Sequence, residues 1–125
     1  MTTITIVLPL PDKCLSPNAR VHWAKKAKVV KHMRVACKYL TTSAIALYGY
    51  PERPNWTRAT YKARFYWKNN RQHDSDNAIA SIKSALDGVA DAGLVVNDSG
   101  LWPERPEFLI DKENPRLEIT FTKEA

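Results

Sequence analysis

Three aspartates in the second half of the chain are placed to hold a metal ion. Asp74 and Asp76 stand two residues apart, so in an extended backbone both carboxylates face the same side, roughly 6–7 Å apart at the backbone. Neighbouring carboxylates raise each other's pKa unless a cation lies between them. Asp98 follows the apolar residues 94–96, which places it at a strand end. Three carboxylates with room for water suit Mg²⁺, with Mn²⁺ as a substitute, and such an ion activates water for attack on a phosphate.

Lys83 adds a cation to this set. It stands seven residues after Asp76, or about two helical turns. Helical side chains lean towards the N-terminus, so we expect the Lys83 ammonium near the carboxylates or near a phosphate bound there. At that place it offsets charge developing on the phosphorus or orients the attacking water.

Each of these residues also has an ordinary structural interpretation. Residues 74–77, Asp-Ser-Asp-Asn, form a good helix N-cap sequence. Residues 97–100 are typical of a turn. Lys83 can pair with Asp87 one turn further along a helix. The residue types alone leave both interpretations open.

Periodicity predicts the elements that position these residues in the first half of the chain. Residues 3–8 are rich in β-branched side chains and predict a strand. Apolar residues at three- and four-residue spacing then predict a long helix that ends before Gly49. Alternation over residues 58–67 predicts a half-buried strand with a basic outer face. The expected apolar stripe of the helix is Trp23, Ala27, Val30, Met33, Cys37, Leu40, Ala44 and Leu47.

The second half predicts one more helix and three short strands. The helix follows residues 74–77 and ends at Gly93, a plausible C-terminal cap. Residues 94–96 predict a short buried strand, and residues 108–110 and 117–121 predict a closing hairpin. The expected fold class is therefore α/β (α+β): one domain over residues 1–125, with a mixed sheet of about five strands and two main helices packed on it. The core face of the second helix is expected to be Ile79, Ile82, Leu86 and Val89.

Composition narrows the class of protein. Hydrophobic residues make up 44% of the chain and charged residues 26%, as in an ordinary folded domain. No apolar run reaches the roughly 20 residues of a membrane span, and the first residues lack the pattern of a secretory signal. We therefore expect a cytoplasmic protein without a membrane partner. Cys14 and Cys37 lack metal-ligand spacing and are expected to be reduced and structural.

Charge is distributed unevenly along the chain. Residues 1–73 hold 14 Lys and Arg against two acidic residues, whereas residues 74–125 hold 5 basic against 11 acidic residues. No acidic residue occurs between positions 13 and 50. A basic surface beside a local acidic cluster suits a polyanion bound over a cation site. The alternative is a solvated basic helix that only keeps the protein soluble.

Several short motifs stand in a characteristic order. They are His73-Asp74-Ser75-Asp76-Asn77, Lys83, Asp87-Gly88, Ala92-Gly93-Leu94 and Asn97-Asp98, with Ser16-Pro17-Asn18-Ala19-Arg20 and His22-Trp23 upstream and Arg116-Leu117-Glu118-Ile119-Thr120 at the end. Together they resemble the RusA family of Holliday junction resolvases, and the upstream motif is similar to that of phage-borne members. The resemblance spans nearly the whole chain. The Asp-x-Asp-Asn motif combined with the lysine and the late aspartate is its most specific part.

The resemblance implies a RusA-like fold and a Mg²⁺-dependent homodimer that nicks two opposed strands of a four-way DNA junction, in DNA recombination and repair. The family's metal-binding aspartates fall on Asp74, Asp76 and Asp98, and its functional lysine falls on Lys83. Two departures from the family pattern matter. The spacing from Asn77 to Lys83 is three residues longer than in the shorter family form, and Asn97 replaces the first carboxylate of the late acidic pair.

DNA contacts are expected from the basic first helix, from the outer face of the second strand and from the segment after that strand. Tyr66 and Trp67 are candidate platforms on which unpaired bases stack, and Trp67 has the alternative interpretation of a core residue. Two other functions stay open: a nuclease that acts on branched DNA more broadly, and a non-catalytic DNA-binding protein with the same fold. The residues expected to contact DNA phosphates are Arg20, Lys25, Lys26, Lys28, Lys31, Arg64, Lys68, Arg71 and His73.

Overall fold

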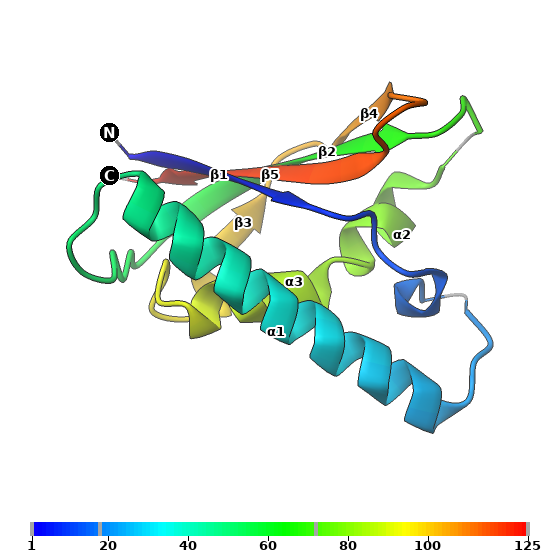
Figure 1. Ribbon diagram of the computed structural model, residues 1–125, viewed down its shortest axis with the longest axis horizontal. Helices are drawn as coiled ribbons and strands as arrows, with labels where there is room; N and C mark the ends of the chain where they lie inside the picture. Colours follow the sequence, from blue (N-terminus) through cyan, green and yellow to red (C-terminus); the bar gives the residue numbers. More distant parts are fainter. Residues whose placement is uncertain (1, 18, 72, 125) are drawn as a thin grey trace.

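Strands form one mixed sheet, and helices cover one of its two faces (Figure 1). The computed structural model describes residues 2–17, 19–71 and 73–124. Asn18, one of the residues in the upstream motif, therefore lies outside the described residues. In chain order the elements are β1 (Thr3–Leu8), η1 (Lys13–Leu15), α1 (Trp23–Leu47), β2 (Ala59–Trp67), α2 (Ser75–Ala80), α3 (Lys83–Asp91), η2 (Asp98–Gly100), β3 (Leu101–Pro103), β4 (Glu107–Ile110) and β5 (Arg116–Lys123).

The sheet is built around β2 and β5. β5 lies between β1 and β2 and runs antiparallel to both. β3 and β4 pair in parallel with the two ends of β2, so that Ala59 faces Leu101 and Trp67 faces Ile110. The expected α+β class is confirmed: a single domain has a mixed five-stranded sheet with two main helices, α1 and α3, packed on it.

The core lies between this sheet and the helices. Alternate residues of the strands point towards the helices and are buried, because successive side chains of a strand face opposite sides. The expected strand over residues 58–67 is confirmed as β2, and its basic and polar residues alternate with the buried ones and are only partly buried. The fully buried strand residues include Ile4, Ala59, Ala63, Phe65, Leu117, Ile119 and Phe121.

Helix α1 ends before Gly49, as expected, but part of its predicted stripe is wrong. Trp23 is 76% exposed, Leu40 39% and Leu47 86%. An ideal helix drifts by about 20° per heptad from a strict seven-residue repeat, so a stripe assigned at that spacing leaves the core over 25 residues. Figure 1 also shows the amino-terminal end of α1 extending beyond the strands. The buried residues of α1 are Met33, Cys37, Thr41, Ala44 and Ile45.

The single second helix of the prediction is two helices, α2 and α3. At the break the Ser81 hydroxyl donates a hydrogen bond to the Ala78 carbonyl at 2.6 Å, and the Ile82 amide donates to the Ile79 carbonyl. Such side-chain bonds to the backbone compete with the helical pattern. Lys83 therefore starts a new helix, and the expectation that it shares one continuous helix face with Asp76 is wrong.

The strands at the carboxyl-terminal end are present but are not paired as a hairpin. β2 lies between β4 and β5, so the expected closing hairpin is wrong. Residues 94–96 form a single bridge, Val95 to Trp56, rather than a strand, and the next strand is β3. Sequence periodicity does not specify which strands pair, because pairing is decided by the packing of the whole sheet.

Helices α1 and α3 approach each other closely at Gly88. A Cβ atom at this position would overlap the carbonyl oxygen of Arg34 and would lie 3.0 Å from the Cβ of Cys37. Cys37 and Thr41 are fully buried at this contact, with their Sγ and Oγ1 atoms 3.8 Å apart. The absence of a side chain at Gly88 thus lets α3 lie directly against the basic helix.

Candidate functional site

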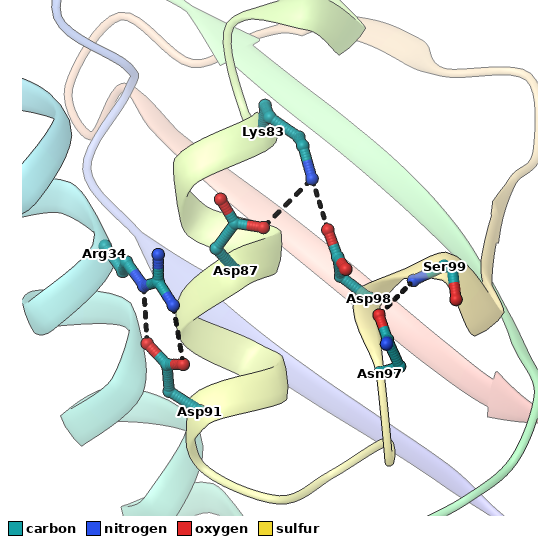
Figure 2. A network of polar contacts seen from close by, with 7 residues as sticks. All are labelled: Arg34, Lys83, Asp87, Asp91, Asn97, Asp98 and Ser99. Carbon is teal, nitrogen blue, oxygen red and sulfur yellow. Dashed lines mark hydrogen bonds and ion pairs between the residues drawn. The ribbon is translucent and has the colours of Figure 1, made fainter.

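Lys83 lies between two carboxylates that come from different elements (Figure 2). Its Nζ donates a hydrogen bond to Oδ1 of Asp87 at 3.0 Å, one turn along α3, and another to Oδ2 of Asp98 in η2. The side chain of Lys83 is 66% exposed, while those of Asp87 and Asp98 are 25% and 30% exposed. We call these three residues the Lys83 cluster. Its two carboxylates share one ammonium at an accessible surface.

The pKa values in the Lys83 cluster reflect this sharing. The pKa of Asp98 lies below its ordinary value, chiefly because Lys83 donates a hydrogen bond to it. The pKa of Lys83 is raised, first by its bond to Asp98 and then by its bond to Asp87. Both shifts favour the charged forms of Lys83 and Asp98 near neutral pH. The cluster sets two carboxyl groups against one ammonium.

Local hydrogen bonds hold the turn that carries Asp98. The Asn97 side chain accepts from the Ser99 amide at 3.1 Å and caps η2. The preceding residues exchange backbone bonds with the segment around Trp56, including Trp56 N to Leu94 O and Val96 N to Trp56 O, both at 2.9 Å. Asn97, which departs from the family pattern, thus has a capping role in this chain.

Gly100 completes the attachment of this turn to the sheet. A Cβ atom at Gly100 would overlap the carbonyl oxygen of Thr57, so the turn lies directly against the start of β2. A larger residue would push the turn away from the sheet. The position of Asp98 opposite Lys83 therefore depends on contacts made over 40 residues earlier in the chain.

Asp74 and Asp76 lie at the start of α2. Oδ1 of Asp74 accepts hydrogen bonds from the amides of Asp76 at 2.8 Å and Asn77 at 3.2 Å, so Asp74 is the N-cap of this helix. Asp76 lies in its first turn, where a negative charge interacts favourably with the helix dipole. The capping interpretation of this sequence is confirmed, and it is compatible with a further role because both side chains are exposed.

The structure brings together only part of the predicted site. Lys83 and Asp98 are in contact, and Asp87 joins them although it was expected only as a helix partner of Lys83. In the part of the chain that the structure describes, no three His, Cys, Asp or Glu side chains form a group that could hold a metal ion. The metal triad of Asp74, Asp76 and Asp98 therefore stays a prediction. The sequence feature that indicates a contact of Asp87 with Lys83 is their four-residue spacing.

The chemistry of the Lys83 cluster fits a divalent cation. Two carboxylates from separate elements already share a cation, the lysine ammonium, and carboxylate oxygens are the ligands that Mg²⁺ prefers. A carboxylate pair held this way repels itself once the ammonium leaves, so a metal ion can replace it. Asp87 and Asp98 are the residues in the cluster able to bind such an ion.

A cleft of about 250 Å³ joins the Lys83 cluster to the basic helix. Lys26 from α1 lines one side, and Lys83, Ser84 and Asp87 from α3 line the other. The Oγ of Ser84 is buried and has no hydrogen-bond partner among the described residues. Lys26, an expected phosphate contact, thus lies across a narrow cleft from the predicted functional lysine.

The other residues expected to contact DNA lie on two sides of the protein. Lys25, Lys28 and Lys31 are exposed on α1, after Arg20 in the preceding segment. Arg64 lies on the face of the sheet without helices, where it donates to Oγ1 of Thr120 and pairs with Glu107. Lys68 and Arg71 are exposed after β2. These residues therefore do not form one continuous surface, and α1 is the part of the set that borders the cleft beside Lys83.

The aromatic rings near Asp74 are covered by other side chains. The imidazole of His73 stacks on the indole of Trp67, with centroids 3.7 Å apart and an interplanar angle of 10°, and Phe65 stacks on Trp67 as well. The guanidinium of Arg116 lies 3.8 Å above the ring of Tyr66. Burial lowers the pKa of His73, which therefore favours its neutral form. The structure thus supports the core interpretation of Trp67, and Arg116 covers the Tyr66 ring.

Comparisons with known proteins give little information about this site. No family model matches the chain. It is similar to an uncharacterized protein of Xylella fastidiosa, with 37% identity over 92 residues, a match that covers 70% of this chain and 56% of that relative. The chain thus spans little more than half the length of the relative.

Two solved structures are distantly similar in shape. Cyanuric acid hydrolase of A. caulinodans has 15% identity and a TM-score of 0.44, covering 98% of this chain and 38% of that one. The periplasmic domain of Helicobacter pylori MotB has 17% identity and a TM-score of 0.35, covering 95% and 81%. Likeness at this level carries no argument about function. Separately, none of the helices in the described residues has the length and hydropathy of a membrane span.

Proposed function

We propose that this protein is a Mg²⁺-dependent endonuclease that resolves four-way DNA junctions by paired nicking. The observation that carries the proposal is the Lys83 cluster, in which Asp98 meets Lys83 from a turn fifteen residues downstream. Asp98 and Lys83 meet beside α1, a helix that carries basic side chains and no acidic one. This arrangement suits a phosphate bound over a metal cation. The resemblance to RusA resolvases names the same residues.

The proposal assigns the metal to Asp74, Asp76 and Asp98, with Asp87 as a further carboxylate beside Asp98. When bound, Mg²⁺ would supply Lewis-acid stabilisation of the phosphate and activation of water. The cap leaves Asp74 able to serve both roles, since only its Oδ1 is engaged in the two cap bonds.

The chain's own residues supply charge and position. The Lys83 ammonium, released from the carboxylates when the cation binds them, would turn to the phosphate and stabilise its added negative charge. Lys26 would hold a neighbouring phosphate across the cleft, because it faces Lys83 there. The exposed lysines of α1 would extend this contact along one DNA arm.

Two further parts of the proposal follow from the reaction. Paired nicks on opposed strands need two active sites, and this chain offers one Lys83 cluster among its described residues, so the proposed active form is a homodimer. A chromosomal or phage DNA substrate would be met in the cytoplasm.

The test is cleavage of a synthetic four-way junction in Mg²⁺, compared with a linear duplex and a flap. Asp98→Asn should lose about 100-fold or more in rate, because a neutral amide replaces a metal-binding carboxylate. Asp91→Asn is the matched control, since Asp91 lies on α3 but pairs with Arg34 instead of Lys83. It should cut at nearly the wild-type rate.

A further variant separates the capping role of Asp74 from the proposed metal role. Asn caps a helix as well as Asp does, so Asp74→Asn keeps α2 stable while removing the carboxylate. It should fold normally, bind the junction at least as tightly and fail to cut it. Wild-type cleavage by Asp74→Asn would remove Asp74 from the metal site, and equal cutting of flap and junction would indicate a general branch nuclease.

A non-catalytic DNA-binding protein is the alternative function. It is favoured by one observation, that the carboxylates are already satisfied by Lys83 and that no three metal-binding side chains are grouped in the described ranges. Tight binding of the junction by wild type, with no cleavage in either Mg²⁺ or Mn²⁺, would establish this alternative.

A further inference from the structure

A hollow lies on the other side of the turn that carries Asp98. Asn97 and Ser99, the two neighbours of Asp98, line this hollow, whereas the Asp98 carboxylate points towards Lys83 (Figure 2). Its volume is about 630 Å³, within the range of sites that bind small molecules. One three-residue turn therefore contributes to both the Lys83 cluster and this hollow.

An exposed tryptophan forms one wall of the hollow. Trp102 in β3 is 61% exposed and Val96 is 68% exposed, and both line it. Large apolar side chains exposed together in this way commonly mark a binding surface. Tyr66 and Trp67, the aromatic residues that the sequence suggested for stacking, are covered by other side chains, whereas the Trp102 indole is accessible.

The polar groups of the hollow suit the edge of a base better than a phosphate. Glu124 also lines the hollow, and a carboxylate there would repel a phosphate but accept hydrogen bonds from an exocyclic amino group. The amide oxygen of Asn97 already accepts from Ser99, which leaves its amino group as a donor. Arg58 is exposed at the rim and supplies the positive charge for the phosphate attached to such a base.

We propose that this hollow binds an unpaired nucleobase next to the phosphate to be cut, with Trp102 as its stacking platform. The inference rests on the proposed DNA substrate and deepens it. A base withdrawn from the duplex at a branch point would stack on Trp102, while its strand continues over η2 to the Lys83 cluster. The site thereby selects DNA with bases that are unpaired or easily unpaired.

The experiment measures binding without catalysis, in EDTA. The probe is a four-way junction carrying the fluorescent base 2-aminopurine at its branch point, together with a 12-nucleotide single strand carrying the same base. Trp102→Ala should weaken binding of the single strand by about 5- to 150-fold, the measured range for loss of one stacked base. Wild type should quench 2-aminopurine through stacking, and Trp102→Ala should not. Trp102→Phe should restore much of the quenching.

Trp23→Ala is the matched control. Trp23 is also an exposed tryptophan, 76% exposed, but it lies at the start of α1. Because α1 is the proposed DNA surface, quenching is compared at saturating protein, and there Trp23→Ala should leave quenching at the branch point unchanged. Equal affinity and equal quenching in wild type and Trp102→Ala, with both folded by circular dichroism, would overturn the inference.

The outcomes separate this inference from the proposed function. A wild type that cuts junctions while Trp102→Ala binds and quenches as wild type does would refute the base site and leave the nuclease standing. A wild type that never cuts but loses stacking in Trp102→Ala would refute the nuclease and leave the base site standing.

Discussion

Two ion-pair contacts of α3 differ in kind, although their aspartates Asp87 and Asp91 lie only four residues apart, about one helical turn (Figure 2). Arg34 and Asp91 form a bidentate pair between α1 and α3, with Nε to Oδ2 at 2.6 Å and Nη2 to Oδ1 at 2.9 Å. One planar guanidinium binds one carboxylate, so the charges balance and both carboxylate oxygens accept a hydrogen bond. The Lys83 cluster instead sets one point-like ammonium against two carboxylates.

This difference indicates what each contact does. The Arg34–Asp91 pair connects two helices that Gly88 already holds close together, and it has no unmatched charge for a ligand. The Lys83 cluster connects α3 to a turn, has more carboxyl groups than cations and opens on a cleft. We therefore assign a structural role to the first contact, whereas the composition of the second supports the binding role proposed for it.

The largest expected effect is a difference in cleavage rate between variants that replace Lys83 and Arg34. Lys83→Met should reduce junction cleavage by about 100-fold, because it removes the charge that stabilises the phosphate. Arg34→Met should leave the cleavage rate per folded molecule nearly unchanged. The rates are measured in single-turnover cleavage with saturating protein. Similar losses in the two variants would show that both contacts act on the fold alone.

The next effect is on stability and comes from the helix contact. Gly88→Ala places a Cβ against the Arg34 carbonyl and the Cys37 side chain, so α1 and α3 must separate. Overpacking of this kind costs about 1–3 kcal/mol in the free energy of unfolding, and contact with rigid backbone favours the upper end. Urea denaturation measures it. An unchanged midpoint would mean that α3 can shift without cost, and the Arg34–Asp91 pair would then not depend on Gly88.

The smallest effect is on the pH dependence of stability. The hydrogen bond from Arg34 lowers the pKa of Asp91 below its ordinary value of 3.8. A carboxylate with a depressed pKa in the folded state stabilises the protein above the unfolded pKa, and this stabilisation is lost as the pH falls through the folded pKa. Asp91→Asn should therefore be slightly less stable than wild type at pH 7, and the difference should vanish near pH 2.

The same titration in Asp98→Asn sharpens the comparison. Asp98 also has a lowered pKa, but Asp87 remains to pair with Lys83 when Asp98 is neutral. The difference from wild type should therefore be smaller than for Asp91→Asn. Urea midpoints at pH 7, 4 and 2 measure both. A larger pH-dependent loss in Asp98→Asn would assign a structural role to the Lys83 cluster.

The sequence by itself determined much of the fold. The span of β1, the end of α1, the alternation of β2 and the stop of the second helical region at Gly93, with its φ of +83°, were all predicted. These features depend on local spacing and on residues with special backbone preferences, which neighbouring positions encode. The capping sequence at Asp74 belongs to the same group.

Only the tertiary structure decided which distant residues meet. The break at Ser81, the placement of β2 between β4 and β5, and the exposure of Trp23 follow from packing of the whole domain. The contact of Asp98 with Lys83 depends on the cap formed by Asn97 and on the close packing of Gly100 against the Thr57 carbonyl. Spacing along the chain predicts the face of a helix or strand on which a side chain lies. Which distant residue it contacts is determined by how the whole domain packs to bury its core.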